Sequence, residues 1–321
     1  MSAFTRRRFI AISAAASGLA LLPFGAALAE AVRWRGVALG APAEMVLHHP
    51  DRDAADRLVA RSVAELARLE RIFSLYRADS ALSRLNAQGF LADPPPELVA
   101  LLETSRHVHA LSDGLFDPTV QPLWQLLARH FAAPGADPAG PSRDDRAAAL
   151  ALVGLDRVAF NPDRIVFRQP GMALTLNGIA QGFITDRIVT LLRAGGVTST
   201  LADLGEIRAL GARPDGTPWC VGLAGEAETL PLIDRAVATS SPEGFRFAGP
   251  QSPGHILDPR TGASAVRHAS VSVIAPEAAT ADALSTAFSL VPSDQLAQML
   301  ARLPGVEVRL VAPDGRRLVF T

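Results

Sequence analysis

The stretch LTLNGIAQGFITDRIV, residues 174–189, predicts a buried strand that passes through a tight turn directly into a helix. Leucines alternate before the Asn177-Gly178 pair, and the apolar residues after it follow a helical spacing. We therefore expect a strand at 172–176 and a helix at 178–195. Small residues at such a turn allow backbone N–H groups to approach a phosphate or a cofactor closely. A tight turn with small-residue packing explains the pattern equally well.

Outward from this stretch, strands and helices are mixed without a strict strand–helix–strand rhythm. Apolar periodicity predicts further helices at 53–72, 95–111, 279–291 and 293–303. Strands are expected within 32–49 and near 157–160, 164–168, 199–205, 230–238 and 269–275. Two hairpins are expected, at 206–225 around Asp215-Gly216 and at 306–320 around Asp314-Gly315. The pattern favours one α+β domain of mixed sheets with packed helices, spanning residues 30–321.

Residues 1–29 are expected to be a targeting segment rather than part of the fold. Arg6 and Arg7 precede an apolar, Ala-rich stretch, and the small residues of 27–29 are typical of a signal peptidase site. The paired arginines resemble a twin-arginine export signal, which implies a periplasmic protein. The apolar stretch is too short to span a membrane, and no cysteine near the cleavage site offers a lipid anchor. We expect a soluble mature protein.

The overall composition narrows the class of protein. Hydrophobic residues make up 49% and charged residues 20%, which is ordinary for a globular chain. The net charge is −1 and basic runs are confined to the N-terminus, which argues against nucleic-acid binding. Every cation is arginine, because the chain contains no lysine. The single cysteine, Cys220, excludes an intrachain disulfide, and we expect it to be a buried strand residue rather than a catalytic thiol.

The loop GHILDPRTG, residues 254–262, gathers several functional groups between two glycines. His255 is a candidate general base, because the pKa of a histidine ordinarily lies near neutral pH. The alternative is a plain turn in which Asp258 caps its own backbone. In the segment GLFDPTVQPLW, residues 114–124, Asp117 follows Phe116 and could accept a bond from a ribityl or adenosine group. A plain turn explains this second segment equally well.

The predicted helix 279–291 carries Asp282, Ser285 and Thr286 on one face, although most of its residues are apolar. A small set of hard oxygen ligands suits Mg²⁺, which retains water or phosphate in its other positions. It does not suit Zn²⁺, which prefers histidine and cysteine. The alternative reading makes Thr280 the N-cap and places Asp282 near the positive end of the helix dipole. That reading accounts for Asp282 but not for the two hydroxyls.

Taken together, six segments resemble the ApbE-type FAD:protein FMN transferases, over nearly the whole of 30–321. They are FSLYRADSALSRLN (73–86), GLFDPTVQPLW (114–124), LNGIAQGFITDRI (176–188), ATSS (238–241), GHILDPRTG (254–262) and ADALSTA (281–287). Each is modest alone, but all six occur in the family's order. The resemblance implies an ApbE-like fold. It also implies an enzyme that transfers FMN from FAD to a Thr or Ser hydroxyl of an acceptor flavoprotein and releases AMP.

The resemblance also implies roles for particular residues. Mg²⁺ is expected to be held by Asp282, Thr286 and the backbone carbonyl of Gly178, with Ser285 adjacent. His255 is the expected base for the acceptor hydroxyl. The residues expected to contact FAD are Leu39, Tyr76, Leu115, Phe116, Asp117, Thr175, Gln181 and Ile256.

Three departures from the family pattern stand out. Thr175 replaces the usual Asp, Gln181 replaces the usual Lys, and Glu206 replaces the second Gly of Leu-Gly-Gly. LNGIAQG and LGEIRALG also resemble the NosX branch, whose implied acceptor is the membrane flavoprotein NosR. Two other functions remain open. The same site would act as an Mg²⁺-dependent FAD pyrophosphatase, giving FMN and AMP, if no acceptor hydroxyl enters it. The missing charges of the glycine-rich block would also permit a non-enzymatic periplasmic FAD carrier.

Overall fold

The centre of the fold is an eight-stranded sheet in which every neighbouring pair is antiparallel. We describe residues 31–223, 229–249 and 252–321 of a computed structural model, so the expected export signal at 1–29 lies outside the described residues. In sheet order the strands are β1 (Val32–Ala38), β2 (Ala41–His48), β6 (Ser199–Asp203), β7 (Ile207–Leu210), β10 (Ala236–Ser240), β11 (Ser270–Ala275), β12 (Glu307–Val311) and β13 (Arg317–Phe320).

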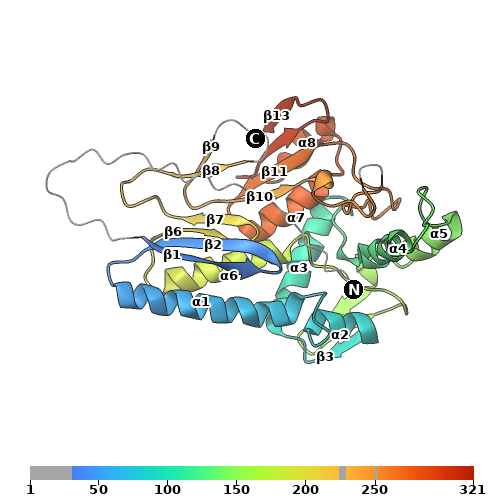
Figure 1. Cartoon of the computed structure of the whole chain (residues 1–321), viewed down its shortest axis with the longest axis horizontal. Coiled ribbons are helices and arrows are strands. Elements are labelled where there is room, and N and C mark those ends of the chain that lie inside the picture. Colours follow the sequence, from blue (N-terminus) through green and yellow to red (C-terminus); the bar gives the residue numbers. More distant parts are fainter. Residues whose placement is uncertain (1–30, 224–228, 250–251) are drawn as a thin grey trace.

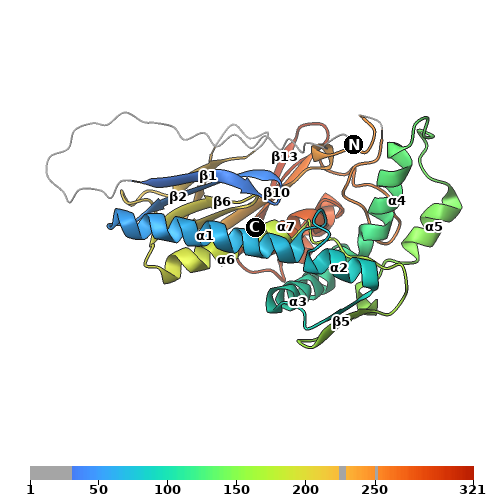
Figure 2. The ribbon, with the colours of Figure 1, turned by 60° about the horizontal axis from the view of Figure 1, so that its bottom comes forward.

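Helices cover one face of this sheet (Figure 1). The α-helices within the described residues are α1 (Arg52–Phe73), α2 (Ala81–Gln88), α3 (Pro96–Leu111), α4 (Gln121–Ala132), α5 (Arg143–Leu150), α6 (Ala180–Ala194), α7 (Ala278–Phe288) and α8 (Ser293–Leu300). Helix α7 packs on β10 and β11 and against α6, while α1 packs on α6 and β1. Apolar side chains of this layer form the main core. Helices α4 and α5 pack together at one end of the molecule (Figure 2), whereas α3 contacts α1 and α7.

A two-stranded sheet, β8 (Trp219–Gly222) with β9 (Thr229–Leu232), covers the opposite face. Val46 and Leu201 point to this side while their neighbours Leu47 and Ala202 point to the main core, as strand alternation requires. A third sheet joins β3 (Phe90–Ala92), β5 (Arg164–Phe167) and β4 (Val158–Phe160). Short 3-10 helices occupy Pro118–Val120, Leu155–Arg157 and Pro242–Gly244. The α+β expectation is therefore confirmed.

The strand expected at 172–176 is wrong, because this apolar segment is a buried loop. Its backbone is paired with a side chain instead of a neighbouring strand. The N–H of Leu174 donates to Asn86 Oδ1 (2.7 Å), and Asn86 Nδ2 donates back to the Leu174 carbonyl (2.8 Å). The N–H of Thr175 donates to the Pro118 carbonyl (2.8 Å). The apolar composition of residues 172–176 therefore predicted their burial correctly, but it did not predict their secondary structure.

The hairpin expected at 206–225 is also wrong, although both of its strands exist. Strand β7 is already paired on both edges, with β6 and β10, so β8 pairs with β9 instead. Cys220 lies in β8 as expected, but its side chain faces outward and is exposed. Thr280 is not a cap, because α7 begins at Ala278 with Glu277 in the N-cap position.

The structure confirms the helices expected at 53–72, 95–111, 178–195, 279–291 and 293–303, and the hairpin expected at 306–320. Within the described residues, no helix combines the length and the apolarity that crossing a membrane requires.

Candidate active site

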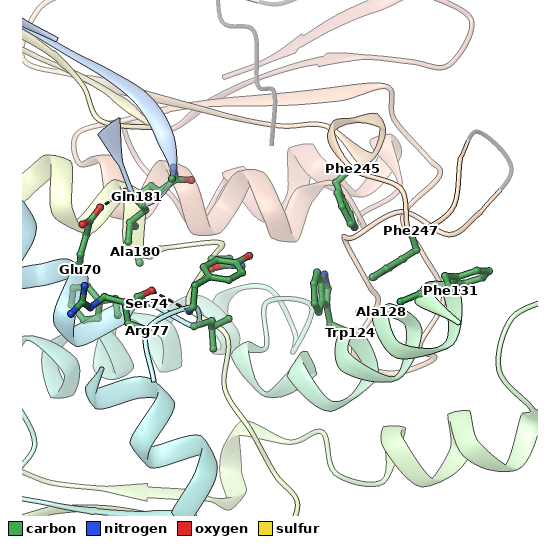
Figure 3. Close-up of a pocket in the computed structure, with 17 residues that line it drawn as sticks. Glu70, Ser74, Arg77, Trp124, Ala128, Phe131, Ala180, Gln181, Phe245 and Phe247 are labelled. Carbon is green, nitrogen blue, oxygen red and sulfur yellow. Dashed lines mark hydrogen bonds between the residues drawn. The ribbon is translucent and has the colours of Figure 1, made fainter. Parts of the chain in front are cut away.

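Two adjoining cavities open beside the N-terminal end of α6, and the smaller one is also lined by Asp282 and Thr286 of α7. The larger has a volume of about 730 Å³ and the smaller about 130 Å³. They share six lining residues, which are Leu39, Gly40, Trp124, Asn177, Gln181 and Phe245. Figure 3 shows the larger cavity between two walls, one aromatic (Trp124, Phe131, Phe245 and Phe247) and one mixed (Glu70, Ser74, Arg77, Ala180 and Gln181). We call the first of these the aromatic wall.

The smaller cavity brings together residues far apart in the sequence. Its lining includes these predicted site residues: Leu39, Leu115, Phe116, Asp117, Thr175, Gly178, Gln181, His255, Ile256, Asp282 and Thr286. Tyr76 lines the larger cavity, and the residue is 70% exposed. Ser285 lines neither cavity.

The candidate metal ligands meet where α7 crosses the glycine-rich turn. A Cβ atom placed on Gly178 would lie only 2.9 Å from Thr286 Oγ1, so the turn and this hydroxyl are immediate neighbours. Asp282 is 4% exposed, and its Oδ2 accepts a bond from the N–H of Gly182 (3.1 Å). Asp282 is the fifth residue of α7, beyond its first turn, so the helix-end explanation of this carboxylate fails.

Ser285 lies behind this cluster rather than in the cavity. Its hydroxyl donates to the Asp282 carbonyl (2.9 Å), so in its contact with Ser240 Oγ (2.7 Å) it is the acceptor. Ser240 also lies 3.5 Å from Thr286 Oγ1 and lines the smaller cavity. Sequence reasoning did not select Ser240, although its segment ATSS was one of the matched blocks. A hydroxyl that supports both Ser285 and Thr286 is marked by no other signal in the sequence.

The donor set fits a hard divalent cation. It offers one carboxylate, one hydroxyl and a backbone carbonyl, which are the oxygen ligands that Mg²⁺ takes alongside water and phosphate. No group of three or more His, Cys, Asp or Glu able to hold a metal ion occurs in the part of the chain that the structure describes. The case for Mg²⁺ therefore depends on Asp282, Thr286 and Gly178 lying together, not on a carboxylate cluster.

His255 is oriented by the loop that precedes it. Its Nδ1 lies 3.1 Å from the carbonyl oxygen of Phe245, and the two rings meet edge to face at 6.1 Å. A carbonyl can only accept, so Nδ1 carries the proton of the neutral ring and Nε2 carries the basic electron pair. Asp258, by contrast, accepts from the N–H of Arg260 (2.9 Å) and pairs with its guanidinium (3.0 Å). The turn interpretation holds for Asp258.

Asp117 lines the smaller cavity, and its carboxylate also binds backbone amides of two neighbouring segments. Its Oδ1 accepts from the N–H of Thr119 (2.8 Å), and its Oδ2 accepts from the N–H of Leu155 (3.1 Å). Burial raises the pKa of this carboxyl, although the bonds from Thr119 and the nearby His109 oppose the shift. His109 also donates to the carbonyl of Phe116 (2.9 Å). The turn that presents Phe116 and Asp117 to the cavity is therefore held by several hydrogen bonds.

Leu39 adopts a left-handed backbone conformation, with φ of 47°, which is rare for a branched residue. Its N–H donates to Glu70 Oε1 (2.6 Å), a carboxylate from α1 that lines the larger cavity. Glu70 thus holds a predicted FAD contact in an unfavourable conformation. Nothing in the sequence of α1 distinguishes Glu70 from its other acidic residues, and we did not predict it.

Two of the departures from the family pattern are close in space. Gln181 lies in the first turn of α6, and a Cβ atom on Gly205 would lie 2.1 Å from its Nε2. Gly205 has a φ of 108°, and Glu206, which follows it, is 4% exposed. Gln181 therefore packs against the strand connection that carries the altered LGE sequence, while it also lines both cavities.

Comparison with known proteins shows the family of this chain. The ApbE family profile matches residues 39–310. The FAD:protein FMN transferase of Treponema pallidum is 34% identical over 282 residues, which cover 78% of this chain and 76% of that protein. The FAD:protein FMN transferase of Escherichia coli K12 is 28% identical over 265 residues, which cover 77% and 74% of the two chains.

Solved structures give the same result. The apo form of the flavinyl transferase ApbE from Pseudomonas stutzeri matches this chain with a TM-score of 0.79 at 28% sequence identity. The match covers 93% of this chain and 98% of the Pseudomonas protein. The ApbE protein of Thermotoga maritima gives a TM-score of 0.80 at 25% identity, covering 91% and 97%. The profile match, the identity to the Treponema protein and the shared fold together establish that this chain belongs to the ApbE family.

Proposed function

We propose that this chain is an FAD:protein FMN transferase. It takes FAD, transfers the FMN half to a Thr or Ser hydroxyl of an acceptor flavoprotein through a phosphoester bond, and releases AMP. The observation that carries the proposal is the convergence of Asp282, Thr286, Gly178 and His255 on one cavity. This set supplies oxygen ligands for a cation and a base for a hydroxyl at the same place. The names of the relatives support the same activity.

The chain's own residues perform positioning and proton transfer. His255 Nε2 takes the proton of the acceptor hydroxyl as its oxygen forms a bond to the FMN-side phosphorus. The bond from that phosphorus to the bridging oxygen breaks, and AMP leaves with the bridging oxygen. General-base assistance of this kind contributes about 10²–10⁴-fold to a rate. Phosphoryl transfer otherwise depends mainly on positioning and charge neutralisation.

Mg²⁺ would be held by Asp282, Thr286 and the Gly178 carbonyl, with Ser285 supporting them from behind. When bound, the ion neutralises charge on the pyrophosphate oxygens. The remaining FAD contacts are assigned to the lining of both cavities, namely Leu39, Tyr76, Leu115, Phe116, Asp117, Thr175, Gln181 and Ile256. Within this set Gln181 can donate a hydrogen bond but brings no charge.

We further propose that residues 1–29 direct export through the twin-arginine route and are removed, leaving 30–321 as a periplasmic transferase. The resemblance of LNGIAQG and LGEIRALG to the NosX branch supports NosR as the acceptor. In that case the enzyme matures a flavoprotein of nitrous oxide respiration.

One experiment separates transfer from hydrolysis and from simple carriage. The protein without residues 1–29 is incubated with FAD, Mg²⁺ and the flavin-accepting domain of NosR. Flavin fluorescence that stays on the acceptor after denaturing electrophoresis is the expected result. Free FMN and AMP without labelled acceptor would establish a pyrophosphatase, and unchanged FAD would establish a carrier. Asp282→Ala should abolish Mg²⁺-dependent turnover, whereas full turnover in this variant would remove Asp282 from the metal site.

A further inference from the structure

Helices α6 and α7 are held together by carboxylates that bond to each other's first turns. Asp186 of α6 accepts from the N–H of Ala278 at Oδ1 and from the N–H of Ala279 at Oδ2, both at 2.9 Å. In return, Asp282 of α7 accepts from the N–H of Gly182 in the first turn of α6, at 3.1 Å. Each helix thus satisfies N-terminal amides of the other, in place of a capping residue from its own chain segment. We call this pair of contacts the reciprocal clamp.

At the reciprocal clamp, α6 and α7 pack so closely that no side chain fits between them at Gly182. A Cβ atom on Gly182 would lie 2.2 Å from the carbonyl oxygen of Ala278 and 2.7 Å from Ala279 Cα. Backbone therefore packs directly on backbone at this crossing. At the same crossing, Gly178 is an immediate neighbour of Thr286. The relative position of α6 and α7 consequently sets the distances among the three candidate metal ligands.

Asp186 is buried, and it has a cationic partner on the sheet. Arg208 of β7 forms an ion pair with it, and the two side chains are only 14% and 15% exposed. Burial raises the pKa of Asp186, while Arg208 and the two amides act against that shift. The carboxylate thus ties the start of α7 both to α6 and to the sheet. Asp186 lines neither cavity, so it has no direct contact with a ligand there.

We propose that Asp186 is a positioning residue for the metal ligands, acting through the first turn of α7 to hold Asp282 and Thr286 against Gly178. This inference rests on the proposed function for the identity of the ion. Outer-shell residues of this kind change metal affinity by about 10–100-fold when removed. We expect Asp186→Ala to weaken metal binding by about tenfold or more, and Asp186→Asn, which keeps one acceptor oxygen, to give an intermediate loss.

The primary test measures Mn²⁺ binding by electron paramagnetic resonance in the presence of ADP, which supplies adenosine and a pyrophosphate. The same variants are assayed for the Mg²⁺ concentration that gives half-maximal AMP release from FAD. The matched control is Asp51→Ala, which removes an aspartate cap that accepts from the N–H of Ala54 (3.0 Å) at the start of α1, away from both cavities. Thermal unfolding without metal reports the loss of stability in every variant.

The expected result is a rise in the Mn²⁺ dissociation constant and in the Mg²⁺ requirement for the Asp186 variants, with high Mg²⁺ restoring most of the rate. Asp51→Ala should lower the melting temperature and leave both metal constants unchanged. Unchanged Mn²⁺ affinity in Asp186→Asn, which is the variant less disruptive to folding, would overturn the proposal. Failure of the proposed function gives a different pattern, because Mn²⁺ binding would still depend on Asp186 while no flavin reached an acceptor.

Discussion

Substitution of Gly182 by alanine should separate α6 from α7. The new methyl group would lie 2.2 Å from the Ala278 carbonyl oxygen, whereas ordinary van der Waals contact begins at 3.4 Å. The obstacle is helix backbone and not the movable end of a side chain, so the two helices must move apart by roughly 1 Å, as the close packing of protein interiors requires. The hydrogen bond from the Gly182 N–H to Asp282 is already 3.1 Å long, so this movement should break it.

The magnitude follows from three contributions. Overpacking destabilises a protein by about 1–3 kcal/mol. Loss of a hydrogen bond to a charged group adds about 1.5–3 kcal/mol. Alanine in place of glycine inside a helix stabilises the folded state by about 0.5–1 kcal/mol, which partly offsets these losses. The free energy of unfolding should therefore fall by about 2–5 kcal/mol, which for a chain of this size lowers the melting temperature by about 4–10 °C.

The matched control is Gly195→Ala at the other end of α6. There the added methyl group would lie 2.3 Å from Leu58 Cδ2, the end of a side chain that can change its rotamer. We expect a loss of about 1 kcal/mol, at the lower end of the overpacking range, because a change of rotamer at Leu58 can relieve the contact. The assay is thermal and urea unfolding of both variants, together with AMP release from FAD, which only Gly182→Ala should reduce. Equal stability of the two alanine variants would refute the direct backbone contact between α6 and α7.

Four further predictions concern single residues. His255→Ala should slow flavin transfer by about 10²–10⁴-fold and leave FAD binding unchanged; an unaltered rate would remove it as the base. Thr286→Val should raise the Mg²⁺ requirement more than Ser285→Ala does, and the reverse order would assign the hydroxyl ligand to Ser285. Burial raises the pKa of Asp203, so ionising it opposes folding as pH rises through that pKa. Asp203→Asn should therefore gain stability relative to wild type at pH 8 but not at pH 3, and a pH-independent difference in urea unfolding would contradict this. Gln181→Lys should tighten FAD binding by about 5–10-fold, the difference of about 1 kcal/mol between a charged and a neutral hydrogen bond; calorimetry that shows weaker binding would mean that Gln181 is held by Gly205 for packing.

Local patterns in the sequence were sufficient to predict the helices but not the strand pairing. The helical spacing of α1 and α6 is carried by nearby residues, so each could be located from its own segment. The pairing of β8 with β9, and not with β7, depends on strands that occupy both edges of β7 from elsewhere in the chain. The buried loop at 172–176 was mistaken for a strand because its backbone partner is the side chain of Asn86, 88 residues away from Leu174.

Residues of the candidate site could be selected from the sequence where they carry distinctive chemistry in short blocks. His255 and Asp282 were found in this way, and the fold brings both to the same cavity. Glu70 and Asp186 were not selected. Glu70 is an ordinary acidic residue of an amphipathic helix, and Asp186 lies in the matched block 176–188 but had no role assigned to it. Their significance comes from distant backbone amides, that of Leu39 for the first and those of α7 for the second. No local pattern records such contacts.

The aromatic wall has a spectroscopic consequence. Of the three tryptophans, Trp124 lines both cavities, whereas Trp219 is buried under the far face of the sheet and Trp34 packs at the main core. The only tyrosine, Tyr76, also lines the larger cavity. A flavin absorbs at the wavelengths where tryptophan emits, so FAD bound beside Trp124 should quench a large share of the intrinsic fluorescence. The tryptophan fluorescence of the wild-type protein should therefore report whether the cavity holds a flavin. The binding and release of FAD can then be followed in real time without any label.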